Sequence, residues 1–430
     1  MPTLAQDHIA ESELHLPNAA ATAPLASGPV CWVLIRATPY HDARFSAFAA
    51  HAATPPVLLE VMDREAFPCL EVPHTAATYI RRPLRSGLQP CDMTPSVLRS
   101  LLFHALDEIR PAVVCVSGWS LPGSIETLAW CAKRGVPAIV FSESTAHDKQ
   151  RSWWKEAVKT QLLSLASAVL VGGRLHAEYA LKLGVPEARI FPGYDAVDNL
   201  HFERGAEAAR RNASALRTRM KLPERYFLAC CRFVEKKNLA RLLQAYSIYR
   251  AKSGGDAWAL VLAGDGVERP ALEALARSLG IEHTAHFIGA RSYDEMPTVY
   301  GLAAAFVHAS TTEQWGLVVN EAAAAGLPLL VSERCGCAPE LVRPGVTGLP
   351  FDPYDIEAIS AAMTSIASPE TDRRAMGQAA RLTAREWSPQ RFADGLSQAV
   401  RIALEYPFPR PALFARLTLR ALSARPLPQE

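Results

Sequence analysis

Short apolar runs recur along the chain from residue 30 onward, and each is bounded by turn residues. In the first half of the chain the runs are Val30–Ile35, Pro55–Val61, Ala112–Val116, Pro137–Phe141 and Ala168–Val171. Longer amphipathic segments follow several of them. Continuous, rather than alternating, apolar runs are typical of strands that are covered on both faces, as in a parallel sheet. The pattern therefore predicts an open α/β domain.

A second series of the same kind follows a polar stretch at residues 203–219. Its runs are Tyr226–Cys231, Trp258–Ala263, His286–Ile288, Ala304–His308 and Pro328–Val331. An amphipathic helix is predicted after the first of these, with Asn238 at its N-cap position. Its apolar residues recur at i, i+3, i+4 and i+7, and they are Leu239, Leu242, Leu243 and Tyr246.

The pattern breaks around Phe191–Asp195, so we place the boundary between the two predicted domains near residues 195–205. Two α/β domains in series leave a cleft between them, which is a usual place for a ligand. A length of 430 residues suits two domains of ordinary size. The first 29 residues show no sustained period and are predicted to form a flexible tail.

Composition narrows the class of protein. Hydrophobic residues make up 49% and charged residues 20%, which is typical of a globular chain. The 45 Lys and Arg residues nearly balance the 43 Asp and Glu residues, which excludes a dedicated nucleic-acid binder. The nine cysteines form neither a disulfide framework nor a zinc pattern. No secretory signal and no apolar run of about 18 residues is present, so we expect a cytoplasmic protein.

The strongest local candidate for a ligand site runs from Glu313 to Glu321, directly after a predicted strand. A helix that begins near Gly316 would direct the free backbone N–H groups of Gly316, Leu317 and Val318 out of its N-terminus. These donors and the helix dipole together favour a phosphate or diphosphate. Glu321, one turn further, could accept hydrogen bonds from a vicinal diol such as a ribose, and Glu313 would face the group beyond the phosphates. The alternative is that both glutamates are solvated or act as cap charges.

A basic loop follows the first strand of the second series. Arg232 and Lys237 can place two cations at the mouth of the same sheet, where a departing diphosphate needs neutralising. Lys236, between them, is expected to point to solvent. The alternative for this loop is a solvated turn.

A glycine pair, Gly264 and Gly266, follows another strand of the second series. Arg269 stands where a dinucleotide-binding fingerprint requires its third glycine, so that fingerprint is not met. A tight turn between strand and helix explains the pair equally well.

Taken in order, these motifs resemble those of the family 4 retaining glycosyltransferases, known as glycosyl transferases group 1. The motifs are Arg232-x4-Lys237, Gly264-Asp265-Gly266, Phe287-Ile288-Gly289, Glu313-x7-Glu321 and Gly326-Leu327-Pro328. The resemblance is specific over residues 226–352 and looser over 30–200. It implies an α/β protein of the GT-B fold, in which two Rossmann-like parallel-sheet domains face each other across a cleft.

The resemblance also implies a division of the chain and a reaction. Residues 30–200 would form the acceptor-side domain and 201–385 the nucleotide-sugar-binding domain, while 386–430 would hold a helix returning toward the first domain and a tail. The implied reaction transfers a hexose from a UDP- or GDP-linked donor to a glycan, lipid-linked or other acceptor, with retention and without a metal or other cofactor. Family analogy points to cell-surface polysaccharide assembly.

Residue roles carry over by position. Arg232 and Lys237 would hold the diphosphate, Glu321 the ribose, and Glu313 the donor-sugar hydroxyls. Arg232, Lys237 and Glu313 are thus the predicted catalytic residues. The predicted donor-binding residues are Gly264, Gly266, Gln314, Trp315, Gly316, Leu317, Val318 and Glu321.

The first domain departs from the family pattern in two places. Many relatives carry a glycine pair in the first strand-to-helix loop, where this chain has residues 37–41, including Tyr40. Relatives often place a histidine facing the sugar where Glu143 stands, and His147 lies about one turn further on. Tyr40, Glu143 and His147 are therefore the predicted sugar-facing or acceptor-side residues, and a plain surface histidine is the alternative for His147.

Two other functions remain open. A sugar-nucleotide epimerase or hydrolase of the same fold would need a general acid and base, and Glu143 with His147 could supply them. A non-catalytic nucleotide-sugar binder is the second alternative, against which the complete Glu313/Glu321 and Arg232/Lys237 pairs argue.

Two basic segments rich in apolar residues raise the possibility of peripheral contact with the inner face of a membrane. The first is Lys149–Lys159, whose tryptophans we expect to pack on the first domain. The second is the C-terminal segment, in which Arg410, Arg416, Arg420 and Arg425 interleave with leucines and Phe414. Packing of that segment back across the domains is the alternative.

Overall fold

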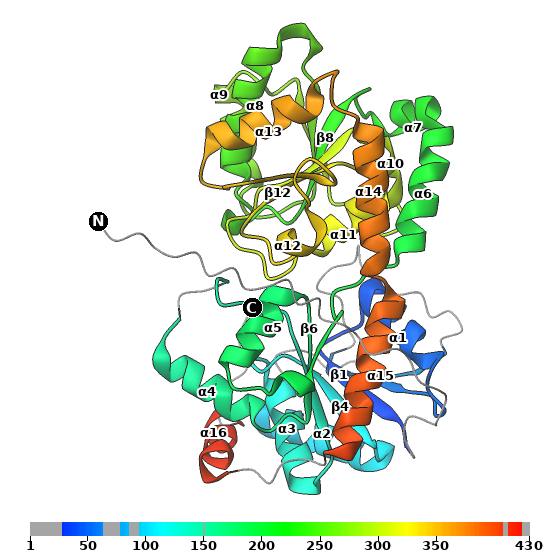
Figure 1. The fold of residues 1–430 in the computed structure, drawn as a ribbon, viewed down its shortest axis with the longest axis vertical. Helices are drawn as coiled ribbons and strands as arrows, with labels where there is room; N and C mark the ends of the chain where they lie inside the picture. Colours follow the sequence, from blue (N-terminus) through cyan, green and yellow to red (C-terminus); the bar gives the residue numbers. More distant parts are fainter. Residues whose placement is uncertain (1–27, 63–77, 86–93, 149–150, 407–411, 424–430) are drawn as a thin grey trace.

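The computed structural model describes residues 28–62, 78–85, 94–148, 151–406 and 412–423. The predicted tail at 1–29 therefore lies almost entirely outside the described residues. Two lobes, each built on its own parallel sheet, follow one another along the chain (Figure 1).

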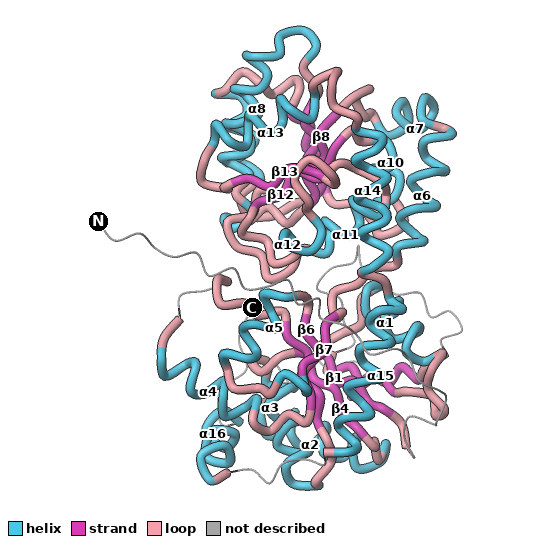
Figure 2. Tube along the Cα trace, in the orientation of Figure 1, coloured by secondary structure: helices cyan, strands magenta, loops and turns pink. Residues whose placement is uncertain are grey.

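The first sheet has seven parallel strands in the order β3-β2-β1-β4-β5-β6-β7. Their bounds are β1 Val30–Leu34, β2 Val57–Glu60, β3 Ile80–Pro83, β4 Val113–Ser117, β5 Ala138–Ser142, β6 Ala168–Val171 and β7 Ile190–Pro192. The helices of this lobe are α1 Pro39–Ala49, α2 Pro95–Ile109, α3 Pro122–Arg134, α4 Trp153–Leu163 and α5 Arg174–Lys182. Helices cover both faces of the sheet, which is why its central strands are fully buried (Figure 2).

The second sheet has six parallel strands in the order β10-β9-β8-β11-β12-β13. The strands are β8 Tyr226–Cys230, β9 Ala259–Ala263, β10 Ala285–Gly289, β11 Ala305–His308, β12 Leu329–Ser332 and β13 Gly348–Phe351. Its helices are α6 Asn199–Arg211, α7 Ala213–Met220, α8 Leu239–Ser253, α9 Arg269–Ser278, α10 Met296–Leu302, α11 Leu317–Ala324, α12 Ala338–Leu341, α13 Ile356–Ala367 and α14 Arg373–Glu386.

The chain returns to the first lobe after α14. Helix α15 (Pro389–Glu405) packs on α1 and on strands of the first sheet, and α16 (Leu413–Ser423) packs on α3 and α4. Figure 1 shows α14 against the second lobe and α15 against the first. The short segment between these two helices therefore joins the lobes a second time.

Three details differ from the sequence expectations. The pattern break at Phe191–Asp195 contains the end of a strand, β7, which lies at the edge of the first sheet. Asn238 does precede α8, but its side chain makes no cap hydrogen bond; it donates instead to the carbonyl oxygens of Ala309 and Pro353. Trp153 was expected to pack on the first domain and is 84% exposed. Helix α4 buries residues at its other end, so its first turn is left in solvent.

Candidate active site

The loops that follow β8 and β11 meet at the same edge of the second sheet, because these two strands are parallel neighbours. The loop after β8 carries Lys237, and the loop after β11 carries Glu313. The two side chains form an ion pair, with the Lys237 ammonium donating to Oε2 of Glu313. The structure thus brings together two residues that are far apart in the sequence.

The Glu313 carboxylate sits in a cluster of donors. Nε2 of His308, the last residue of β11, lies 3.4 Å from Oε2, and the Ser310 hydroxyl donates to the same oxygen at 3.3 Å. Lys237 and Glu313 are only 11% and 14% exposed. A freely solvated glutamate and a freely solvated loop lysine are therefore excluded for this pair.

Two opposing effects set the charge of Glu313. Burial alone would raise the pKa of its carboxyl, but the hydrogen bond with His308 and the charge and hydrogen bond of Lys237 outweigh burial and hold this pKa well below its usual range. Burial lowers the pKa of His308, so the imidazole is neutral near pH 7 and can donate its Nε2 proton. Glu313 is therefore a fixed anion that accepts hydrogen bonds.

The other two cations of this loop are less enclosed. Lys236 is largely exposed, as expected, yet its Nζ lies 3.9 Å from Oε1 of Glu313. Arg232 is exposed on the same loop as Lys237. The basic loop thus presents its charge to Glu313 and to solvent at the carboxyl end of β8.

Glu321 lies inside α11, with only 2% of its surface exposed. Tyr40 donates its hydroxyl proton to Oε1 at 2.5 Å, and Tyr300 donates to Oε2 at 2.7 Å. Burial raises the pKa of Glu321 to about 7, although the two tyrosine hydrogen bonds oppose the shift. A solvated or capping role is excluded, because both oxygens are engaged below the surface.

The N-terminus of α11 has the geometry that its sequence predicts. Gly316 precedes the helix with φ = 108°, a left-handed conformation that favours glycine. The first N–H groups of a helix have no carbonyl partner within it, so those of Leu317 and Val318 are available there. Trp315, next to Gly316, is buried and donates its indole N–H to Asn320 at 2.8 Å. This contact fixes the approach of the loop to the helix.

The glycine pair after β9 allows close packing of two loops. A side-chain carbon at Gly264 would lie 1.9 Å from the carbonyl oxygen of Cys231, and one at Gly266 would lie 2.4 Å from that of Phe233. Only glycine fits at either position. The pair therefore holds the loop after β9 against the loop that carries Arg232.

Glu143, directly after β5, pairs with a residue that the sequence did not single out. Its charge acts on the carboxyl of Asp195, which is fully buried and receives no N–H or O–H hydrogen bond from the described residues. Nη2 of Arg44 lies 3.8 Å from Oδ1 of Asp195. Burial, followed by the charge of Glu143, raises the pKa of Asp195 well above its usual range. The Asp195 carboxyl is therefore driven toward its neutral, protonated form.

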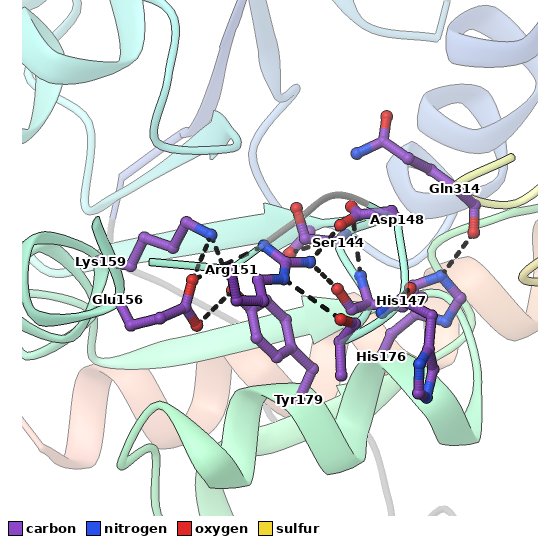
Figure 3. A network of polar contacts seen from close by, with 12 residues as sticks. Ser144, His147, Asp148, Arg151, Glu156, Lys159, His176, Tyr179 and Gln314 are labelled. Carbon is purple, nitrogen blue, oxygen red and sulfur yellow. Dashed lines mark hydrogen bonds and ion pairs between the residues drawn. The ribbon is translucent and has the colours of Figure 1, made fainter. Parts of the chain in front are cut away.

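Ion pairs hold the loop that follows Glu143 and the first turns of α4 in place. Arg151 pairs with Asp148, and Glu156 pairs with Lys159 at 2.9 Å, as Figure 3 shows. His147 is exposed on this loop and its backbone N–H donates to Thr145 Oγ1 at 3.2 Å. The structure thus places His147 at the surface of the loop that begins at the partly buried Glu143.

A further contact from the first lobe reaches the site loop. His176 lies at the start of α5, and its Nδ1 accepts the Gly173 N–H at 3.1 Å. The proton of the neutral ring is therefore on Nε2. Nε2 donates it to the carbonyl oxygen of Gln314 at 3.0 Å (Figure 3). Burial lowers the pKa of His176, in agreement with this neutral tautomer. The Gln314 carbonyl is therefore held from the opposite lobe.

Sequence reasoning missed His308, Tyr300 and His176. His308 had a usable signal, because it is a polar residue that ends a fully buried parallel strand. Tyr300 and His176 lie on helices with no distinctive pattern, and only the fold brings them to the site.

Within the described residues, no group of three or more His, Cys, Asp or Glu side chains is arranged to hold a metal ion. None of the helices in that part of the chain combines the length and apolar character needed to cross a bilayer.

Comparison with solved structures defines the class of fold. The structure superposes on a glycosyltransferase from Rickettsia africae with a TM-score of 0.69 at 13% identity, covering 88% of this chain and 99% of that one. It superposes on the Anabaena protein HepE in complex with UDP with a TM-score of 0.67 at 15% identity, covering 86% and 98%. The chain therefore has the GT-B fold, with two Rossmann-like domains.

Sequence comparison identifies the family. The model for glycosyl transferases group 1 matches residues 216–383, and that for a glycosyl transferase 4-like domain matches 40–192. The D-inositol 3-phosphate glycosyltransferase of Salinispora arenicola is 31% identical over 336 residues, which is 72% of each chain. That of Corynebacterium urealyticum is 34% identical over 150 residues, so the match spans 35% of that relative's length. The chain belongs to the group 1, family 4 glycosyltransferases, as the motifs indicated.

Proposed function

We propose that this protein transfers a hexose from a UDP- or GDP-linked donor to a glycan, lipid-linked or other glycoconjugate acceptor, with retention at the anomeric carbon. One observation carries the proposal: the buried Lys237–Glu313 pair lies just before a helix N-terminus, with Glu321 one turn further along that helix. This arrangement brings a cation, backbone N–H donors and two carboxylates together at one edge of the second sheet.

Each group matches a part of a nucleotide sugar. Lys237 and Arg232 would neutralise the diphosphate as it leaves, assisted by the N–H groups of Leu317 and Val318 at the start of α11. Glu313, kept ionised by its neighbours, would accept hydrogen bonds from sugar hydroxyls. These bonds would hold the anomeric carbon in position for the reaction. Glu321 would accept hydrogen bonds from the ribose. These side chains and N–H groups supply the charge stabilisation in the proposed mechanism, which uses no metal.

The donor would thus bind mainly to the second lobe and the acceptor to the first. HepE, a structural relative, was solved with UDP, and relatives in sequence are named as glycosyltransferases acting on inositol 3-phosphate. Glu143, the neighbouring Asp195 and the hydroxyl of Tyr40 would form part of the first lobe's contribution. A place in cell-surface polysaccharide assembly is the pathway we favour by family analogy.

A peripheral contact with the inner face of the membrane fits the same role. Leu413, Phe414 and Leu417 are exposed on α16, and the exposed cations Arg416 and Arg420 lie on the same helix. Apolar side chains with arginines beside them suit an anionic bilayer surface. Such a contact would bring the first lobe to a lipid-linked acceptor. Arg410 and Arg425, which the sequence also suggested, lie outside the described residues.

The first test of the proposed function is nucleotide binding by the purified chain. Thermal unfolding is followed with UDP, GDP or ADP at millimolar concentration. A nucleotide at about 100 times its Kd stabilises a protein by about 2.7 kcal/mol, which shifts Tm by several degrees in a chain of this size. A shift with one base selects the donor for turnover assays, and the absence of any shift would contradict the proposal.

Product analysis separates transfer from the other chemistries of this fold. Incubation with the selected nucleotide sugar and no acceptor should give at most slow hydrolysis. An epimerised sugar nucleotide would instead indicate an epimerase, with Glu143 as a candidate acid or base. Full biological activity of a Glu313→Gln variant that no longer turns over would indicate a binding protein.

A further inference from the structure

Tyr40 and Glu321 belong to different lobes, yet their side chains are bonded to each other. Tyr40 lies in the first turn of α1, a helix that packs on α15 within the first lobe. Glu321 lies in α11 of the second lobe. The tyrosine hydroxyl donates to Oε1 of the carboxylate at 2.5 Å, a short hydrogen bond to a partner in the opposite lobe.

The position of Tyr40 is fixed at both ends. Its backbone sits just after Pro39, which occupies the first position of α1 and pre-orders the turn. The Tyr40 ring enters the second lobe, where it packs edge-on against the ring of Tyr293 with centroids 5.9 Å apart. Tyr293 in turn stacks on His201 at 4.4 Å. The contact between Tyr40 and Glu321 is therefore supported by packing in both lobes.

With Tyr40 in place, both carboxylate oxygens of Glu321 are hydrogen-bonded and the side chain is closed off from solvent. The glutamate is 2% exposed, and its second oxygen accepts the hydroxyl of Tyr300 from α10 of its own lobe. A ribose that binds the Glu321 carboxylate must therefore displace one of the two tyrosines. Tyr300 is itself fully buried within the second lobe, so the displaceable partner is Tyr40, which is only half-buried.

We propose that Tyr40 is a latch between the lobes: its hydroxyl occupies the place of a ribose hydroxyl on Glu321, and the donor must exchange with it in order to bind. This inference rests on the proposed function, because it takes Glu321 as the ribose ligand. When the donor binds Glu321, the hydrogen bond between Tyr40 and Glu321 breaks. The first lobe then loses this contact with the second lobe, and the Glu321 carboxylate becomes accessible to the ribose. Tyr300 keeps the carboxylate oriented during the exchange.

The latch reduces the apparent affinity for the donor. When only a fraction of the molecules is competent to bind, the observed Kd is the intrinsic Kd divided by that fraction. Removal of the Tyr40 hydroxyl abolishes the competing hydrogen bond to a charged group, which is a strong one. The Tyr40→Phe variant should therefore bind nucleoside diphosphates about tenfold more tightly than the wild type.

The chain offers a matched control for this variant. Tyr79 donates its hydroxyl to Oδ1 of Asp42 at 2.6 Å, so it too bonds a carboxylate and also involves α1, but both partners belong to the first lobe. Tyr79→Phe removes the same kind of hydrogen bond without touching the contact between the lobes. Its Kd for the nucleotide should equal that of the wild type.

The experiment is titration calorimetry of full-length wild type, Tyr40→Phe and Tyr79→Phe with UDP, GDP and ADP. The same Tyr40→Phe change is also made in a Glu321→Ala background, where the latch has lost its partner. Tighter binding by Tyr40→Phe alone, with no gain in the Glu321→Ala background, is the result expected. Thermal unfolding of each variant verifies that it is folded.

The outcomes separate the latch from the proposed function. If UDP, GDP or ADP binds the wild type and Tyr40→Phe equally, or binds Tyr40→Phe more weakly, the latch is wrong while the nucleotide site stands. An equal gain in the Glu321→Ala background also overturns the latch, because Tyr40 would then act through another group. If none of the three nucleotides binds any of the proteins, the proposed function fails, and the latch with it.

Discussion

At the scale of single residues, two glutamates of one short segment are driven to opposite states by their surroundings. Glu313 is buried beside a cation, and its pKa is held well below its usual range. Glu321 is buried with tyrosine hydroxyls and no cation, and its pKa is raised to about 7. Desolvation acts on both, and the partner decides the outcome. The first is a fixed anion, whereas the second changes its charge near neutral pH.

The raised pKa of Glu321 predicts a pH-dependent gain in stability for Glu321→Gln. Between the ordinary pKa of 4.5 and about 7, the folded protein binds more protons here than the unfolded chain does. The free energy of unfolding therefore falls as pH rises through this window, and the full destabilisation is present above pH 7. The amide cannot ionise, so Tm of Glu321→Gln should exceed that of the wild type by several degrees at pH 8 and by less at pH 5.

Thermal unfolding of the two proteins at both pH values checks this, with each difference taken within one pH so that other titrations cancel. A Tm difference that is the same at pH 5 and pH 8 would show that ionisation of Glu321 does not cause it.

The Lys237–Glu313 pair predicts a loss of turnover in Lys237→Met. The side chain keeps its length but loses the charge that would stabilise a departing diphosphate, so kcat should fall about 10²–10³-fold. Lys252→Met is the control, because Lys252 forms an exposed ion pair with Glu357 in the same lobe. Steady-state kinetics with the nucleotide sugar selected by the binding test measures both variants. Equal kcat values for Lys237→Met and the control would remove Lys237 from the mechanism.

At the scale of elements, the strands that the sequence did not predict share one property. The missed strands are β3, β7 and β13, and each lies at the edge of its sheet. An edge strand has a neighbour on one side only and needs no continuous apolar run, as the sequence Ile-Arg-Arg-Pro of β3 shows. The interior strands are covered on both faces, so apolar runs predicted them to within a few residues.

In the candidate site, too, the sequence predicted local relations but not contacts between distant elements. Spacing within one loop or helix predicted that Glu313 and Glu321 flank the N-terminus of α11, because that relation is local. The partners of these residues come from other elements: His308 from the end of β11, Tyr300 from α10 and Tyr40 from the first lobe. Such contacts depend on how whole elements pack, which spacing within one segment does not encode.

The turn after β6 yields a prediction at the scale of elements. Gly172 lies where the two lobes meet: a side-chain carbon there would lie 2.6 Å from Asp195 Oδ2 and 2.9 Å from the ring of Trp315. Gly172→Ala should therefore destabilise the protein by about 1–3 kcal/mol through overpacking. Gly255→Ala is the control, since nothing lies within 4 Å of an added carbon there. Denaturant unfolding of both variants checks the prediction, and equal midpoints would show that the interface relaxes around the methyl group.

At the scale of the whole molecule, the C-terminal helices tie the lobes together and shape the surface of the first one. Helix α15 crosses back onto α1, and α16 then packs on α3 and α4. In Figure 1, α16 lies beside α4, on the side of the first lobe away from the second sheet. Its packed face consists of Ala415, Leu419 and the partly buried Leu422, whereas Leu413, Phe414 and Leu417 are exposed. A bilayer bound there would leave the site between the lobes open.

This arrangement predicts that α16 binds anionic vesicles through Phe414, which is 71% exposed. Insertion of a large apolar side chain into the interface contributes about 1.5–3 kcal/mol, so Phe414→Glu should weaken binding about tenfold or more. The fold should be unaffected, because Ala415, Leu419 and Leu422 make the packing contacts of this helix. Leu382→Glu is the control: Leu382 is an apolar residue on α14 of the other lobe and is 60% exposed. Cosedimentation with vesicles of phosphatidylserine and phosphatidylcholine measures all three proteins. Weakened binding in Phe414→Glu alone would place the membrane contact on α16, whereas equal binding by all three, or none by the wild type, would rule it out.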